Sequence, residues 1–163
     1  MSKLFVDEIQ PKTTGGVINA KGMVIQVVQG SYNVAQSTTS SSYVDTGLTA
    51  SITPHNSNSK ILVMADAMGA GGVISGSSNS EGNFQIIRNS IALVSTAVRG
   101  YDYGNSGMIS FSTVNLKWLD TPATTSTLIY KLQFKRRDSS STIRINQDPE
   151  TGGSTITLME IGG

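Results

Sequence analysis

The fold is decided by the stretch Met108–Arg136, which reads MISFSTVNLKWLDTPATTSTLIYKLQFKR. In its second half, apolar residues occupy the even positions from Leu128 to Phe134, and lysine or glutamine stands at positions 131, 133 and 135. A β-strand with one buried and one solvated face has this period of two residues. The first half alternates in the same way up to Trp118. The stretch therefore predicts two β-strands.

A proline-bearing connection separates these two strands. Pro122 lacks a backbone N–H and favours extended geometry in the residue before it, so it belongs between the strands. If the strands pair antiparallel, their buried faces bring together the heaviest apolar load of the chain, Trp118, Tyr130 and Phe134. We expect this pair to form the core of a sheet.

The rest of the chain consists of further β-patterned runs, without a convincing amphipathic helix. About eight to ten short strands with many turns predict an all-β fold, a sandwich or jelly roll. Asn89-Ser90 stands between two apolar runs and predicts a hairpin, whereas Gly69–Asn83 and Arg99–Gly107 are expected to be loops. The other expected strands are Met23–Gln29, Tyr43–Pro54, Lys60–Ala65, Phe84–Arg88, Ile91–Ser95, Thr142–Asn146 and Ser154–Ile161.

One of these strands, Lys60–Ala65, is apolar on both of its faces. One face can serve the core of the domain. The other face needs a cover, which a neighbouring subunit could supply. Leu62 and Met64 are therefore candidate interface residues.

The N-terminal segment, residues 1–22, has too little apolar surface to fold alone. Its short alternation at Leu4–Asp7 is broken by Pro11 and by the glycines at 15 and 16. It is either a loose tail or an arm that orders against another chain. We accordingly expect an extended arm over residues 1–22 and a β-sandwich domain over residues 23–163.

Composition excludes several classes of function. The 163 residues carry a formal net charge of +1 and only 14% charged residues, which argues against nucleic acid or an anionic membrane as a partner. The most apolar stretch, Ile61–Met68, is interrupted by Asp66 and is far shorter than the ~20 residues of a spanning helix. The first residues lack the apolar core of a signal peptide. We expect a protein made in a cytoplasm, neither inserted in a membrane nor exported by a standard route.

The sequence gives little support for a catalytic site or a metal site. The chain has no cysteine, and its single histidine, His55, lies in an expected turn, which excludes the common zinc constellations. No glycine pattern frames a serine as a nucleophile elbow. The run Gly69–Ile74 lacks the third glycine and the following helix of a dinucleotide loop. We expect no enzyme, no cofactor and no metal, since the loop carboxylates also lack the spacing of a calcium loop: Asp102, Asp138, Asp148 and Glu150.

Two segments could bind a ligand. Around Tyr101 and Tyr103, the polar residues Arg99, Asp102 and Asn105 could hydrogen-bond the hydroxyls of a sugar or the surface of a protein. The simpler interpretation, which we favour, is that both tyrosines pack the loop down. The basic run at 135–137 could form an anion patch, but such runs are more often the solvated end of a hairpin.

Three segments carry a resemblance when taken in order. They are Leu4–Gln10 with Thr14–Gly16, Val44–Pro54 with Ser59–Val63, and Leu119–Ser126 continuing through Tyr130–Phe134. With the ending Ser154–Ile161, they resemble small fibre and decoration proteins of tailed bacteriophages, particularly those infecting marine bacteria. The segments cover most of the chain, and their succession is more specific than any one of them.

This resemblance implies a jelly roll that forms a homotrimer, similar to the tumour-necrosis-factor and complement trimers, in the virion. Residues 1–22 would anchor it to other phage structural proteins through Leu4, Phe5, Val6 and Ile9. The knob would serve host attachment on a tail fibre or spike, facing a host surface glycan or protein. The alternatives are a capsid decoration or head-fibre protein that stabilises the particle, and a carbohydrate-binding module. The absence of a long shaft repeat favours a compact spike or decoration over a long fibre.

Overall fold

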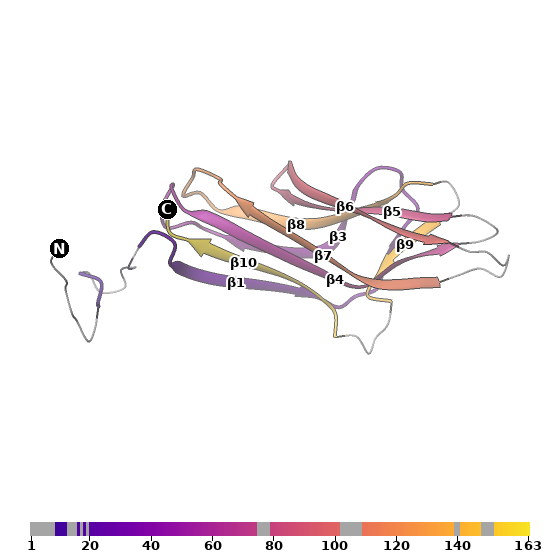
Figure 1. The fold of residues 1–163 in the computed structure, drawn as a ribbon, viewed down its shortest axis with the longest axis horizontal. Helices are drawn as coiled ribbons and strands as arrows, with labels where there is room; N and C mark the ends of the chain where they lie inside the picture. Colours follow the sequence, from indigo (N-terminus) through magenta and orange to yellow (C-terminus); the bar gives the residue numbers. More distant parts are fainter. Residues whose placement is uncertain are drawn as a thin grey trace.

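The computed structural model describes residues 9–12, 16, 18, 20–74, 79–101, 109–138, 141–147 and 152–163. Within these residues the chain forms β-strands in two antiparallel sheets and no helix (Figure 1). Sheet A has the order β1 (Val24–Tyr32), β10 (Ser154–Ile161), β4 (Lys60–Ile74), β9 (Ser141–Ile145) and β2 (Gln36–Thr38), with β7 (Ile109–Asp120) paired to β4. Sheet B has the order β3 (Val44–Ile52), β8 (Leu128–Arg136), β5 (Asn79–Arg88) and β6 (Ile91–Tyr101).

The chain alternates between the two sheets. After β2 it crosses to sheet B for β3, returns to sheet A for β4, and crosses again for the β5–β6 hairpin. It then returns for β7, crosses for β8, and ends in sheet A with β9 and β10. The result is a jelly-roll-like β-sandwich, which confirms the fold class that the sequence predicted.

The core lies between the two sheets and is built by the inward positions of each strand. On β8, the even positions from Leu128 to Phe134 are all buried, as their alternation predicted. The rings of Phe84 and Phe134 pack with their centroids 6.0 Å apart. The facing strands β4 and β10 contribute Ile61, Val63, Ala65, Ala67, Ile156 and Leu158. Hydrophobic burial of this kind is the main force that holds a sandwich together.

The predicted pairing of the two strands in 108–136 is wrong. β7 pairs with β4 in sheet A, and β8 pairs with β3 and β5 in sheet B, so the connection through Pro122 crosses from one sheet to the other. Alternation shows which face of a strand is buried, but it does not identify the strand's partner. Trp118 is also not a core residue: it lies opposite the buried Val63, but it is 42% exposed because β7 has no second neighbour among the described strands to cover it.

The predicted loop Gly69–Asn83 is also wrong at both of its ends. β4 continues to Ile74, and β5 begins at Asn79. The glycine-rich end of β4 is held because Gly71 pairs with Phe111 of β7 and with Arg144 of β9. Likewise, β6 continues to Tyr101 where a loop was expected from Arg99 onwards.

The two ends of the sandwich differ. The C-terminus and the root of the N-terminal segment lie at one end, where the N–H of Gly22 donates to Gly162 O at 2.7 Å and the N–H of Gly162 donates to Met23 O at 2.9 Å (Figure 1). The end of β4 and the end of β6 lie at the opposite end. Of the predicted anchor residues, Ile9 is exposed, and Leu4, Phe5 and Val6 lie outside the described residues.

Candidate functional site

The outer face of sheet A carries a row of apolar side chains. Val27 of β1 lies opposite Met159 of β10, which lies opposite Leu62 of β4, which lies opposite Leu119 of β7. These four residues, the apolar row, span four strands of the sheet. Val27 is 55% exposed and Leu119 is 46% exposed, while the two central side chains are partly buried by their neighbours. Nothing else in the described part of the chain covers this row.

The apolar row has a polar border on one side. Met64 lies in the next register, between Thr157 and Lys117. The register after that contains Asp66, whose carboxylate accepts a hydrogen bond from the Asn115 amide. The structure therefore places both sequence-predicted interface residues, Leu62 and Met64, on the outer face of sheet A, with Leu62 inside the row and Met64 at its border.

The row extends in the other direction, toward the end where the termini lie. Val24 of β1 pairs with Ile161 of β10, and both Met23 and Val24 are exposed. Contiguous exposed apolar surface of this kind is rare on soluble monomers and usually marks an interaction site. Sequence analysis found only the β4 part of it, because the partners on β1, β10 and β7 become neighbours only once the strands are ordered.

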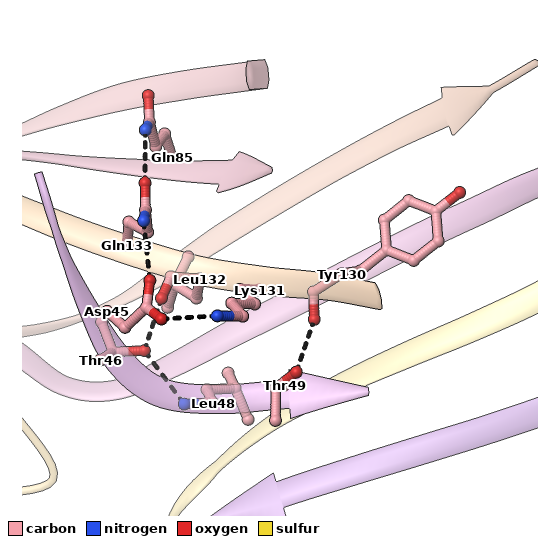
Figure 2. Close-up of polar contacts among 9 residues, drawn as sticks. All are labelled: Asp45, Thr46, Leu48, Thr49, Gln85, Tyr130, Lys131, Leu132 and Gln133. Carbon is pink, nitrogen blue, oxygen red and sulfur yellow. Dashed lines mark hydrogen bonds and ion pairs between the residues drawn. The ribbon is translucent and has the colours of Figure 1, made fainter. Parts of the chain in front are cut away.

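The outer face of sheet B carries polar side chains around Gln133 that are bonded to one another (Figure 2), and Ile129 of β8 is exposed further along the same face. The Gln85 amide donates to Gln133 Oε1 at 2.8 Å, and the Gln133 amide donates to Asp45 Oδ1 at 2.7 Å. Lys131 Nζ donates to Asp45 Oδ2 at 2.7 Å, and this bond helps to lower the pKa of Asp45 below its ordinary value. We call Gln85, Gln133 and Asp45 the amide ladder. It runs across three strands, β5, β8 and β3.

A bulge in β3 fixes the start of this ladder. The pairing of β3 with β8 shifts between Asp45 and Thr49, and Gly47 lies inside the shift with a φ of 92°. Thr46 Oγ1 donates to Leu132 O at 2.8 Å and accepts from the N–H of Leu48 at 3.2 Å (Figure 2). A bulge bends the strand while side chains replace the lost ladder bonds.

A charged corner lies further along sheet B, toward the ends of β6 and β8. Arg99 Nε lies 3.3 Å from Glu81 Oε1, and Arg137 Nη1 lies 3.4 Å from Glu81 Oε2. Lys135 Nζ lies 4.6 Å from the centroid of the Tyr43 ring, within the range of a cation–π contact. We define the charged corner as Arg99, Glu81, Arg137, Lys135 and Tyr43.

The predicted loop Arg99–Asn105 is only partly described. Arg99 belongs to β6, and Tyr101 ends that strand opposite Asn79. Asp102, Tyr103 and Asn105 lie outside the described residues, so their proposed role as a binding loop stays a prediction.

His55 is bonded to a buried carboxylate that the sequence analysis did not single out. Glu160 has no exposed surface, and its oxygens accept from the His55 N–H at 2.7 Å and from Gln26 Nε2 at 2.6 Å. His55 Nδ1 lies 2.8 Å from the same carboxylate. Burial raises the pKa of Glu160, but hydrogen bonds from His55 and Gln26 outweigh it and lower that pKa to about 2. The sequence did hold a signal: Glu160 shares an inward face with Ile156 and Leu158.

A second buried network joins the two sheets. Asp120 of β7 accepts from Arg88 Nη1 of β5 at 2.8 and 2.7 Å and from the Tyr130 hydroxyl of β8 at 2.7 Å. Burial and the nearby carboxylate raise the pKa of Tyr130, so its hydroxyl stays a donor. Because all three side chains are used in this contact, we assign it a structural role.

The described residues form neither a metal site nor a membrane-spanning helix. No group of three or more His, Cys, Asp or Glu side chains lies close enough to hold a metal ion there. In the same residues, no helix is long and apolar enough to cross a membrane.

Comparison with known proteins bears on the fold alone. No protein-family model matches the chain, and no curated protein matches it. Among solved structures, the fold is similar to part of dimeric latent PorU from Porphyromonas gingivalis, with a TM-score of 0.50 and 9% identity. That likeness covers 90% of this chain and 14% of the PorU chain. A similarity at this level of identity supports the β-sandwich and transfers no activity.

Proposed function

We propose that the protein is a bacteriophage virion structural protein: a trimeric β-knob, anchored to the tail or capsid by residues 1–22 and displayed outward for host attachment. The observation that carries the proposal is the contrast between the two sheets. Sheet A exposes the apolar row, and sheet B exposes bonded polar side chains. The resemblance of several sequence segments to phage fibre and decoration proteins is the reason for proposing that the assembly belongs to a virion. A capsid decoration protein that stabilises the particle is the alternative within the same class.

The apolar row supports self-association on energetic grounds. Full burial of a Val, Leu or Met side chain contributes roughly 1.5–3 kcal/mol, so completing the burial of a half-exposed one contributes on the order of 1 kcal/mol. Val27 and Leu119 are the most exposed of the row and gain the most. In a closed trimer this contribution occurs three times.

A cyclic trimer also requires a second surface. Only a contact between two different patches closes a ring of three, because like-to-like contacts give a two-fold dimer. Exposed apolar side chains at the edges of β7 and β6, Trp118 and Ile91, offer such a patch. We propose that this edge of one subunit covers the apolar row of the next.

The arrangement of the two ends supports outward display. The root of residues 1–22 is bonded to the C-terminal residues at Gly162. The ends of β4 and β6 lie at the other end of the sandwich (Figure 1). If the arm holds the particle, those strand ends point away from it.

In this proposal the protein is not an enzyme. Its single histidine is bonded to the buried Glu160, where it holds the connection between β3 and β4 against β10. That arrangement explains the histidine as a structural residue.

Deleting residues 1–20 separates anchoring from assembly. We expect the truncated protein to form the same oligomer in native mass spectrometry and to be missing from particles produced by a phage that carries the deletion. Incorporation of the truncated protein at the normal level would overturn the anchoring role.

A carbohydrate-binding module is the second candidate, and the amide ladder favours it. Side-chain amides held in place by neighbours are suited to hydroxyl groups. The two functions are distinguished by the same deletion, because removal of residues 1–20 leaves a glycan site on sheet B untouched.

A further inference from the structure

We propose that the outer face of sheet B binds an acidic polysaccharide: Arg99 and Arg137 hold the carboxylate of a uronic acid, and the amide ladder holds sugar hydroxyls. The inference deepens the proposed function, on which it rests in one respect. If the outer face of sheet A is covered in the trimer, the outer face of sheet B is the broad surface that stays accessible.

The first observation is the charge balance at the charged corner. Arg99 and Arg137 both contact the single carboxylate of Glu81, from opposite oxygens. Their side chains are 51% and 43% exposed, whereas that of Glu81 is 21% exposed. Both cations therefore contact the Glu81 carboxylate at the surface. Each guanidinium has five N–H donors and contacts Glu81 through one nitrogen, so its other donors are not used by Glu81.

The neighbouring register adds positive charge. Lys135 lies over the Tyr43 ring, and Lys131 is balanced by Asp45. Around this face four basic residues, Arg99, Lys131, Lys135 and Arg137, lie near three acidic ones, Glu81, Asp45 and Asp138, while the whole chain has a net charge of +1. Asp138, which follows Arg137, is bonded to the backbone N–H of Glu81 at 2.7 Å and to Ser141.

The geometry favours a carboxylate as the bound anion. The planar fork of arginine matches the two oxygens of a carboxylate, and such pairs are among the stronger polar contacts in proteins. The Glu81 side chain already occupies this position, with one oxygen toward each arginine. A uronic acid carboxylate approaching from solvent would meet the N–H donors of both guanidinium groups that Glu81 does not use.

The amide ladder lies at a distance suited to the rest of a sugar chain. Gln133 lies on the outer face of β8 (Leu128–Arg136), and Arg137 follows the end of that strand four residues later, at most about 14 Å away. Gln85 and Gln133 each use one amide N–H within the ladder, so the second N–H of each is available to a hydroxyl. Because both amides are already fixed by their neighbours, binding orders few side chains.

The test is binding of defined polysaccharides by the full-length protein. The probe is fluorescein-labelled oligogalacturonate, compared by anisotropy with dextran and dextran sulfate of similar length. We expect oligogalacturonate to bind, dextran not to bind, and dextran sulfate to bind at least tenfold more weakly. Equal binding of the two anionic probes would show attraction to any polyanion and would overturn the carboxylate site, as would absence of oligogalacturonate binding.

Matched variants locate the site. Arg99→Gln with Arg137→Gln should weaken oligogalacturonate binding at least tenfold. Lys12→Gln with Lys21→Gln removes the same charge near the termini and should leave it within twofold. Equal losses in the two double variants would overturn the proposed location.

A variant that is expected to bind more tightly tests the site in a way that misfolding cannot imitate, because misfolding would weaken binding. Glu81→Gln removes the internal carboxylate that competes for both arginines, so it should tighten oligogalacturonate binding several-fold. Unchanged or weaker binding in this variant, with the native oligomer retained, would contradict the inference. Native mass spectrometry on the same samples keeps the two proposals distinct, since failure to bind the probe by an intact trimer overturns this inference alone.

Discussion

Met159 on β10 lies opposite Leu62 on β4, and both side chains face out of the sandwich in the middle of the apolar row. Val27 and Leu119 extend the row to the neighbouring strands. Four apolar side chains in register on an outer face are expected to be buried against a partner, because they do not contribute to the core between the two sheets.

Leu62→Asp is expected to prevent assembly. The carboxylate would be buried at each of three equivalent interfaces, and burial of an unpaired charge costs several kcal/mol per site. Native mass spectrometry should show monomer. Met64→Asp should have a weaker effect, because Met64 lies at the polar border beside Thr157 and Lys117.

Ser51→Asp is the matched control for this substitution. It places the same charge on the outer face of sheet B, where Ser51 is exposed. We expect this variant to keep the oligomer of the natural protein. A Leu62→Asp variant that assembles as well as Ser51→Asp would mean that the apolar row is not the interface.

Stability should fall in acid because of Glu160. Its pKa is lowered to about 2 in the folded state, below the ordinary value of 4.5, so its contribution is present above pH 4.5 and is lost as the pH falls toward 2. A shift of this size corresponds to about 3 kcal/mol. Urea unfolding should show the natural protein more stable than Glu160→Gln at pH 7, with the difference closing by pH 2. A difference that stays constant across this range would contradict the assignment.

Asp120→Leu should destabilise the fold through its partners. It leaves the Arg88 guanidinium without its carboxylate in a mostly buried position, at a cost of about 3–5 kcal/mol in the free energy of unfolding. Tyr130→Phe removes one hydrogen bond and should cost about 1 kcal/mol. The double variant Arg88→Met with Asp120→Leu should recover much of the loss, which urea unfolding can measure. If the double variant is as unstable as Asp120→Leu, the ion pair is not the cause.

Gly47→Ala should be more costly than Gly22→Ala. Both glycines have positive φ, 92° and 81°, so alanine is strained at either position. A Cβ at Gly47 would lie 2.5 Å from the Tyr32 ring, whereas a Cβ at Gly22 would meet nothing within 4 Å. We expect Gly22→Ala to cost about 1 kcal/mol and Gly47→Ala about 1–3 kcal/mol more. Equal melting temperatures for the two variants would contradict this packing.

The elements that the sequence predicted well are those defined by local pattern. The final strand Ser154–Ile161 has the predicted bounds. The turn at Asn89-Ser90 joins β5 to β6, with Asn89 at a φ of 53°, a conformation that asparagine tolerates. In both cases the local structure is determined by residues that are neighbours in the sequence.

The errors arise where the decisive neighbour is distant in sequence. The pairing partner of β7 is β4, whose paired residues lie 36 to 59 positions earlier, and nothing local in 108–136 identifies it. The glycines of 69–72 have low strand propensity, and pairing on both sides overrides it. His55 is bonded to Glu160, which lies 105 residues later in the chain. The apolar row was missed for the same reason, apart from Leu62.

The mass of the purified full-length protein in solution tests the central claim most directly. Native mass spectrometry, or light scattering after gel filtration, should give three times the chain mass of 17.2 kDa at micromolar concentration. A stable monomer under these conditions would mean that the apolar row on sheet A stays exposed in solution, and it would contradict the trimeric knob.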